Sequence, residues 1–203
     1  MIRLSVTDLE TWRYWKDKEE GTIEELVQDL RGGKEPTHEM QASRAFHSLL
    51  EHVKPGEDLE RLTHPEGWVF DFNFDGELCV PPIRELKTER VWRTPSGPVT
   101  LVGKVDNICG LTVEDYKLSE RFDAERYTDS WQWRAYLAMF KARRFVYRVF
   151  QCAYDAQNPY HVRIYELHSF PLDAYPEMLV DLDGVLDELA AFVKAHVPEK
   201  LAA

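Results

Sequence analysis

One stretch of the 203-residue chain, Leu101 to Leu118, constrains the fold more than any other. It contains most of two segments rich in Val, Leu, Ile, Thr and Tyr, residues 99–109 and 112–118, on either side of Gly110. Such segments favour strands, and a glycine between them favours a tight turn. The stretch therefore predicts a β-hairpin with Gly110 and Leu111 as a two-residue loop.

This loop fixes which side chains face one another. Counting outward from it places Asp106 opposite Asp115 and Lys104 opposite Lys117, all on one face because side chains alternate along a strand. Directly opposed side chains have Cβ atoms about 4.5–5.5 Å apart, so two carboxylates would meet. That pairing is unfavourable unless a cation lies between them, and Mg²⁺ is bound in proteins by one or two carboxylates.

The same hairpin carries two short motifs, G-K-V-D ending at Asp106 and D-Y-K beginning at Asp115. In this order they resemble motifs II and III of the PD-(D/E)XK nuclease superfamily, in its RecB-like branch. The resemblance implies that Asp106 and Asp115 bind one or two Mg²⁺ or Mn²⁺ ions, with the backbone carbonyl of Tyr116 as a further ligand. It implies that Lys117 orients or activates the attacking water and stabilises charge on the scissile phosphate.

An upstream helix, expected over residues 39–53, has apolar side chains at core spacing. Its sequence S-R-A-F-H-S-L-L-E is similar to the A/G-x-x-x-H-x-x-L-E helix of RecB-like nucleases. The resemblance implies that His47 is a metal ligand and that Glu51 supports the site or forms a helix salt bridge. A lone histidine on a helix is otherwise structural or solvated. A histidine with carboxylates also suits Mn²⁺.

A downstream helix is expected from about residue 130 to Arg143. Gln132 and Tyr136 are four residues apart and share a face, with Arg143 on the same side further along. Q-x-x-x-Y after D-x-K resembles the signature of the RecB-like and lambda-exonuclease-like branch. It implies that these side chains contact the DNA backbone or support Lys117. The alternative is ordinary surface packing.

The strand before the hairpin, residues 83–92, alternates charged and uncharged side chains. Related nucleases place an acidic residue on this strand near the metals, and the resemblance assigns that role to Glu89 rather than Glu85. A solvated strand face would give the same pattern.

The remaining elements predict an α/β fold. Further strands are expected at 68–74, followed by a turn at Asp75 and Gly76, and at 145–154 and 160–170, with a packing or oligomer helix at 175–196. Capping boxes at Thr7 to Glu10 and Thr22 to Glu25 predict two N-terminal helices, the second ending at Gly32. With the resemblance, this order implies one domain, residues 1–203, with a restriction-endonuclease-like core: a mixed central sheet flanked by helices.

Composition limits the partners. The net charge is −11, but residues 84–148 hold 13 basic and 9 acidic side chains, so the segment with the hairpin is net basic and suits a local DNA-binding cleft. Three dispersed cysteines, Cys79, Cys109 and Cys152, argue against a disulfide framework and against the four-cysteine iron–sulfur cluster of some RecB-like nucleases. No secretion signal or membrane span is visible, so a cytoplasmic protein is expected.

Taken together, the motifs imply a divalent-metal-dependent DNA nuclease. The expected activity is exonucleolytic hydrolysis of phosphodiester bonds at DNA ends in recombination or repair, as in a phage or small repair enzyme. One alternative is a nuclease-like module that binds DNA or a recombination partner without cutting, and another is an endonuclease. A homo-oligomer or a partner protein is compatible with either.

Overall fold

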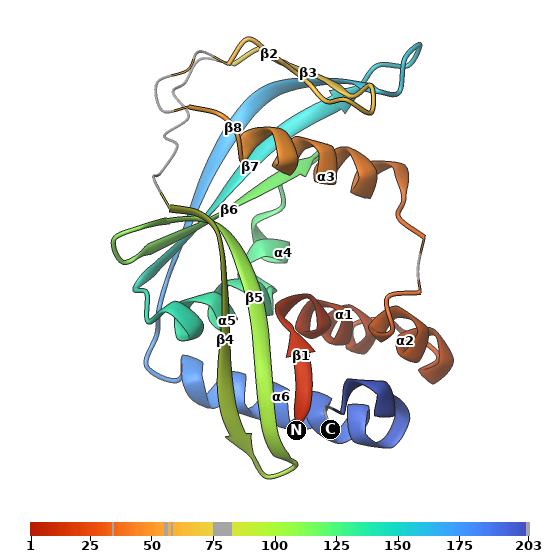
Figure 1. Cartoon of the computed structure of the whole chain (residues 1–203), viewed down its shortest axis with the longest axis vertical. Coiled ribbons are helices and arrows are strands. Elements are labelled where there is room, and N and C mark those ends of the chain that lie inside the picture. Colours follow the sequence, from red (N-terminus) through yellow and green to blue (C-terminus); the bar gives the residue numbers. More distant parts are fainter. Residues whose placement is uncertain (34, 55–56, 58, 75–82, 202–203) are drawn as a thin grey trace.

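The structure, a computed structural model, describes residues 1–33, 35–54, 57, 59–74 and 83–201. Its centre is an eight-stranded mixed sheet in the order β1-β5-β6-β7-β8-β3-β2, with β4 paired to β5 outside that order (Figure 1). The expected α/β class, a mixed central sheet flanked by helices, is confirmed. The predicted turn at Asp75 and Gly76, like Cys79, lies outside the described residues.

The strands and helices have the following bounds. The strands are β1 (Ile2–Ser5), β2 (Arg61–Thr63), β3 (Val69–Phe72), β4 (Ile83–Thr94), β5 (Gly97–Cys109), β6 (Thr112–Ser119), β7 (Arg144–Tyr154) and β8 (His161–Asp173). The helices are α1 (Val6–Lys16), α2 (Ile23–Leu30), α3 (His38–Leu50), α4 (Ala124–Asp129), α5 (Trp131–Phe140) and α6 (Met178–His196), followed by the 3₁₀ turn η1 (Pro198–Lys200). Strand pairs β1–β5, β6–β7 and β3–β8 are parallel, and the others are antiparallel.

The predicted hairpin forms, but its two strands stay paired only near the turn. Gly110 has a positive φ of 59°, and Cys109 pairs with Thr112 as the two-residue loop requires. The backbone ladder then ends at Asn107 and Glu114. The expected strand pairings of Asp106 with Asp115 and of Lys104 with Lys117 are therefore wrong, because β5 continues beside β1 and β4 while β6 continues beside β7.

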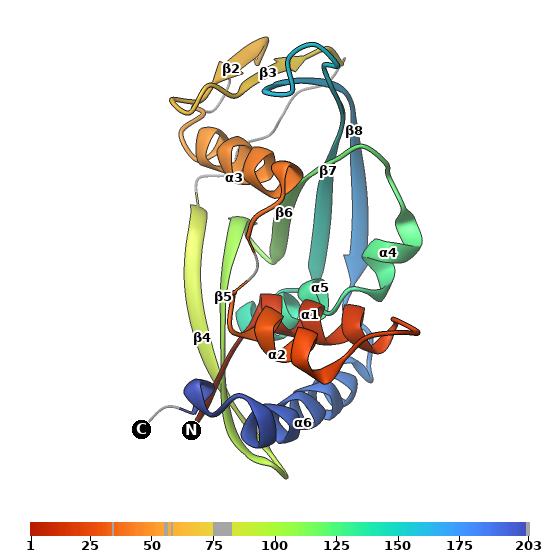
Figure 2. The same ribbon diagram turned by 90° about the vertical axis from the view of Figure 1, so that its right-hand side faces the viewer.

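Two hydrophobic cores lie on the sheet. The larger one contains side chains of α1, α2, α5 and α6 packed against β1 and β5, and the smaller one contains α3 packed against β3, β7 and β8. In both views α3 lies near β2 and β3, while α1, α2, α5 and α6 gather at the opposite end of the molecule (Figures 1 and 2). The hairpin contributes to both cores, through Val105 and Val113 to the larger and Tyr116 to the smaller.

Helix α1 starts two residues earlier than its sequence predicts. Ser5, the last residue of β1, is the N-cap and forms a capping box with Asp8, so the predicted box of Thr7 and Glu10 is wrong. The physical reason is the parallel pairing of β1 with β5, which ends at Ser5 and Val102. The second box is confirmed with Thr22 as N-cap, and α2 ends before Gly32, which has a φ of 74°. Within the described residues no helix is both long and apolar enough to cross a membrane.

The divergence of β5 from β6 leaves room that Tyr136 fills. A Cβ added at Gly103 would lie 2.6 Å from Cε1 of Tyr136, which is closer than real Cβ contacts allow, and at a tight 3.1 Å from Cγ2 of Val6. The Tyr136 hydroxyl donates a hydrogen bond to the Lys104 carbonyl at 2.7 Å. The glycine of G-x-x-D and the tyrosine of Q-x-x-x-Y therefore depend on each other through packing.

Gly103→Ala is expected to lower the free energy of unfolding by about 1–3 kcal/mol, because overpacking forces Tyr136 or the β5 backbone to move. Urea unfolding measures the change. Gly184→Ala in α6 is the matched control, since nothing lies within 4 Å of its added Cβ, and it should raise stability by about 0.5–1 kcal/mol. Equal stability of Gly103→Ala and the wild type would contradict the packing account.

Candidate active site

Two carboxylates are buried where β5 and β6 diverge. Asp106 is 9% exposed and Asp115 is 4% exposed, and the charge of Asp106 acts on Asp115. Burying an ionised carboxylate is costly unless it is paired and hydrogen-bonded. Their partners therefore determine what the site can do.

Asp106 is held by one backbone group and one side chain. Its Oδ2 accepts the Tyr116 N–H at 2.7 Å, which replaces the backbone ladder just where that ladder has ended. Its Oδ1 lies 3.2 Å from Nδ1 of His47, which comes from α3. Burial opposes the charge on both groups, but their mutual attraction lowers the pKa of Asp106 and raises that of His47.

Asp115 has different partners. Lys117 Nζ lies 2.6 Å from its Oδ2, and Nε2 of Gln132 donates to its Oδ1 at 2.9 Å. Burial raises the pKa of Asp115 to about 6, with a further increase from Asp106 that Lys117 opposes. Burial acts against the Lys117 ammonium as well, but the charge of Asp115 keeps the pKa of Lys117 above its usual value.

The structure thus brings together His47, Asp106, Asp115, Lys117 and Gln132, which come from four elements predicted to carry the site. Tyr136 is nearby but buried, with its hydroxyl bonded to the Lys104 carbonyl, so its contacts support β5. Tyr116 places its side chain in the smaller core. Its backbone N–H binds Asp106, and the role of its carbonyl as a metal ligand stays a prediction.

Glu10 fixes the start of α5, and the sequence analysis missed this role. Its Oε1 accepts hydrogen bonds from the Ser130 hydroxyl at 2.9 Å and the Gln132 N–H at 3.0 Å, so a carboxylate lies at the positive end of the helix. This contact anchors the helix turn that presents Gln132 to Asp115. The pairing joins residues about 120 positions apart, so no local pattern signals it.

Arg143 lies beyond the end of α5. The predicted helix would have carried it beyond Tyr136, but α5 ends at Phe140 because Lys141 adopts the left-handed conformation, with a φ of 53°. The Arg143 N–H then donates to the carbonyl of Leu111 at the tip of the hairpin. Its predicted place on the face of Gln132 is therefore wrong.

The acidic side chains near the site line different cavities. Glu89, the residue preferred from the sequence, is exposed and pairs with Arg3 at 3.0 Å at the edge of a large cleft. Glu85 lines a smaller cavity with His47, Asp106 and Glu51, and it is ion-paired with Lys104. Glu85 also has a positive φ of 54°, which is strained for a residue with a Cβ and is characteristic of functional sites.

Two adjoining cavities make the site accessible. The large cleft has a volume of about 980 Å³ and exposes His47, Asp115, Lys117 and Gln132 together with the basic side chains Arg3, Lys87 and Lys104. The smaller cavity, about 320 Å³, lies on the side of Asp106, Glu51 and Glu85. The carboxylates are therefore buried but within reach of a ligand.

The chemistry of the donor set suits a divalent cation. Two carboxylates and an imidazole are the oxygen and nitrogen donors that Mg²⁺ and Mn²⁺ accept. Among the described residues, the buried Oδ2 of Asp115 accepts no hydrogen bond of normal geometry. Its charged neighbour is the Lys117 ammonium, with which it is ion-paired. In the part of the chain that the structure describes, no group of three or more His, Cys, Asp or Glu side chains is arranged so that it could already hold a metal ion.

Comparison with known proteins adds information on the fold alone. No family model matches the chain, and no curated protein matches it. A solved structure, described as the crystal structure of SSO0001, is similar over 100% of this chain and 89% of its own, with a TM-score of 0.54 and 14% sequence identity. At this identity the similarity concerns the arrangement of elements only.

Replacing Asp106 with Asn should lower the pKa of His47, because burial then acts on the imidazole without the charge of Asp106. Histidine NMR titration in a chelator measures it, with His47→Gln used to assign the signal. In the wild type the pKa is raised, so protonated His47 stabilises the fold fully below about pH 6.5, and this contribution is lost as pH rises through the raised value. An unchanged His47 pKa in Asp106→Asn would contradict the pairing.

Proposed function

We propose that this chain is a divalent-metal-dependent DNA nuclease of the RecB-like, lambda-exonuclease-like branch of the PD-(D/E)XK superfamily, with a restriction-endonuclease-like core. One observation carries the proposal: side chains from the four motifs lie in one connected cluster. His47 bonds to Asp106, and Asp115 bonds to Lys117 and Gln132. Residues scattered over positions 47 to 132 have no packing reason to share a buried polar cluster. Burying two carboxylates with a lysine costs stability, and such arrangements occur at functional sites.

Asp106, Asp115 and His47 are the side chains that would hold the metal. When bound there, Mg²⁺ or Mn²⁺ supplies a Lewis acid for the phosphate and a water of lowered pKa. Gln132 fixes the orientation of the Asp115 carboxylate, and the Tyr116 N–H fixes that of Asp106. These supporting bonds keep the oxygens in place for ligand binding.

Lys117 supplies positive charge where the phosphate becomes more negative in the transition state. Its Nζ is held 2.6 Å from Asp115 and also faces the large cleft. A preorganised cation in a partly dehydrated site stabilises developing charge without having to reorganise. Its raised pKa means that the ammonium is charged at neutral pH, so charge stabilisation is the role that its protonation state supports.

The large cleft supports DNA as the substrate. Four basic side chains line it, Arg3, Lys87, Lys104 and Lys117, against two acidic ones, Glu89 and Asp115, so its lining is net positive although the chain carries a net charge of −11. A local concentration of positive charge attracts a polyanion even to an acidic protein. We propose an exonuclease of recombination or repair in the cytoplasm, because that activity fits the motif order G-x-x-D, D-x-K and Q-x-x-x-Y.

Two other functions use the same cleft. A nuclease-like module would bind DNA or a partner protein without cutting, and the acidic overall charge favours it. An endonuclease would cut within a strand. The first alternative requires binding without hydrolysis, and the second requires cleavage without a free end.

With Mn²⁺, the protein is expected to degrade linear duplex or single-stranded DNA and to leave covalently closed circles intact. The reason is that an exonuclease needs a strand end. Gel analysis of both substrates with the same preparation measures this. Cleavage of the closed circles would indicate an endonuclease, and binding of linear DNA without cleavage would favour the module.

Lys117→Ala and Asp106→Ala are each expected to reduce cleavage at least about 10²-fold, because each removes a group that stabilises the transition state or holds the metal. Lys18→Ala is the matched control, since Lys18 is exposed and lines none of the cavities of the site. Circular dichroism confirms folding of each variant. Full activity in either site variant would overturn the proposed mechanism.

A further inference from the structure

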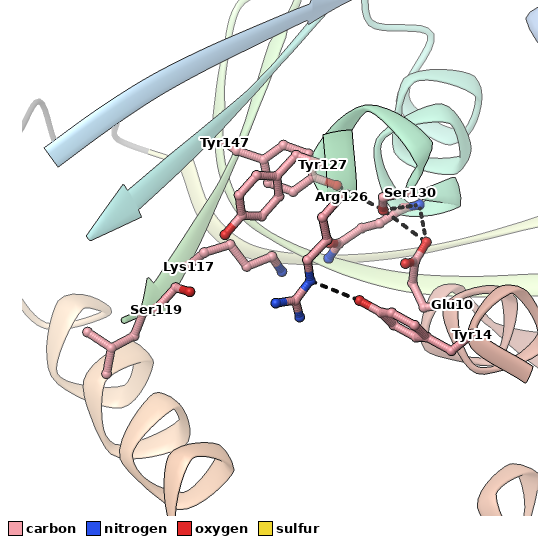
Figure 3. Close-up of a pocket in the computed structure, with 10 residues that line it drawn as sticks. Glu10, Tyr14, Lys117, Ser119, Arg126, Tyr127, Ser130 and Tyr147 are labelled. Carbon is pink, nitrogen blue, oxygen red and sulfur yellow. Dashed lines mark hydrogen bonds between the residues drawn. The ribbon is translucent and has the colours of Figure 1, made fainter. Parts of the chain in front are cut away.

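A separate cavity of about 200 Å³ adjoins Lys117. Its walls come from α1, β6, α4, α5 and β7, and they include Tyr14, Lys117, Ser119, Arg126, Tyr127 and Gln132 (Figure 3). Lys117 and Gln132 also line the large cleft, so the two spaces meet at these side chains. Tyr14 and Arg126 have no role in the proposed catalytic mechanism.

Two cations face this cavity. The guanidinium of Arg126 points toward the ammonium of Lys117, and its Nε donates to the Tyr14 hydroxyl at 3.1 Å, which sets its orientation (Figure 3). Over the described ranges, Arg126 forms no ion pair with a carboxylate. An oriented guanidinium without a carboxylate partner binds phosphate oxygens well.

The one carboxylate of the lining does not neutralise these cations. Glu10 is already engaged at the start of α5, where its Oε1 accepts hydrogen bonds from the Ser130 hydroxyl and from the Gln132 N–H. Figure 3 shows this contact on the far side of the cavity from Ser119. Lys117 is ion-paired with Asp115, which lies outside the lining, so Arg126 is the cation of this cavity that forms no ion pair with a carboxylate of the described residues.

The volume of the cavity and the aromatic side chains of its walls restrict which anion can bind there. Tyr14, Tyr127 and Tyr147 give the cavity aromatic walls. A cavity of about 150 Å³ holds a benzene molecule, so one of about 200 Å³ holds part of one nucleotide and has no room for a base pair. Stacking of single bases on aromatic side chains is a common way to bind unpaired strands.

We propose that this cavity is a subsite for one unpaired nucleotide of the DNA strand, with its phosphate between Arg126 and Lys117 and its sugar or base against Tyr14 and Tyr127. The inference rests on the proposed nuclease function and names its substrate class. The strand must be single-stranded, or unpaired at its end, where it enters the subsite. Arg126 and Tyr14 then determine specificity for unpaired DNA.

The test is DNA binding in a chelator, measured by fluorescence anisotropy with a single-stranded oligothymidylate and with a blunt hairpin duplex of equal charge. The wild type should bind the single strand more tightly. Arg126→Gln should weaken binding of the single strand about tenfold, the effect of losing one charge-assisted hydrogen bond. It should leave duplex binding nearly unchanged, because the base pair does not enter the cavity.

Two further variants make the result specific. Arg121→Gln removes an exposed arginine near Arg126 in the chain that does not line the cavity, and it should affect both DNAs little. Tyr14→Phe keeps the ring but removes the acceptor of the Arg126 Nε bond, and it should weaken single-strand binding by a smaller factor. Urea unfolding checks that each variant is folded.

Equal weakening for both DNAs in Arg126→Gln, or no weakening, would overturn the subsite. If the wild type cuts linear DNA and Arg126→Gln binds the single strand as tightly as the wild type, the result contradicts the subsite but not the nuclease function. A wild type that prefers single strands through Arg126 but cuts no DNA supports the subsite and contradicts the nuclease function. The binding and cleavage measurements thus distinguish the two failures.

Discussion

The site depends on the burial of two aspartates beside each other. Asp106 and Asp115 are buried from the water that would solvate their charges, and Asp106 makes Asp115 harder to ionise. The protein offsets this cost with His47 beside Asp106, whose pairing raises the pKa of the imidazole, and with the Lys117 ammonium beside Asp115. The arrangement is costly for stability, and under the proposed function its use is to hold oxygen ligands and a cation ready at one position.

This position exists because the two strands of the hairpin, β5 and β6, separate beyond Asn107 and Glu114. Once β5 and β6 stop pairing, Asp106 uses its side chain to accept the Tyr116 N–H that the ladder would have bound. Helix α5 inserts Tyr136 beside Gly103 and brings Gln132 to Asp115, while α3 brings His47 from the other core. The active-site candidate is thus built where two separately packed halves of the molecule meet.

Local sequence signals predicted much of this arrangement. Gly110 with its flanking β-branched residues specified the hairpin and its register next to the turn, and the four-residue spacing placed Gln132 and Tyr136 on one helix. The errors arose where distant residues decide the outcome. Strand β1 depends on pairing with residues about 97 positions away, which moved the start of α1 to Ser5 and released Glu10 to cap α5. Lys141 ends α5 without the glycine that signals such an end, and Glu85 turns toward the smaller cavity through a backbone conformation that few residues adopt.

The central claim is that the buried aspartate pair is a binding site for a divalent cation. Calorimetric titration with Mn²⁺ tests it most directly, with the wild type compared to Asp115→Asn, which keeps the shape of the side chain and removes its charge. We predict saturable binding to the wild type and binding weakened at least about tenfold in the variant, the lower end of the loss expected when a ligand environment is disturbed. The absence of Mn²⁺ binding to the wild type, or identical binding to both proteins, would contradict the account.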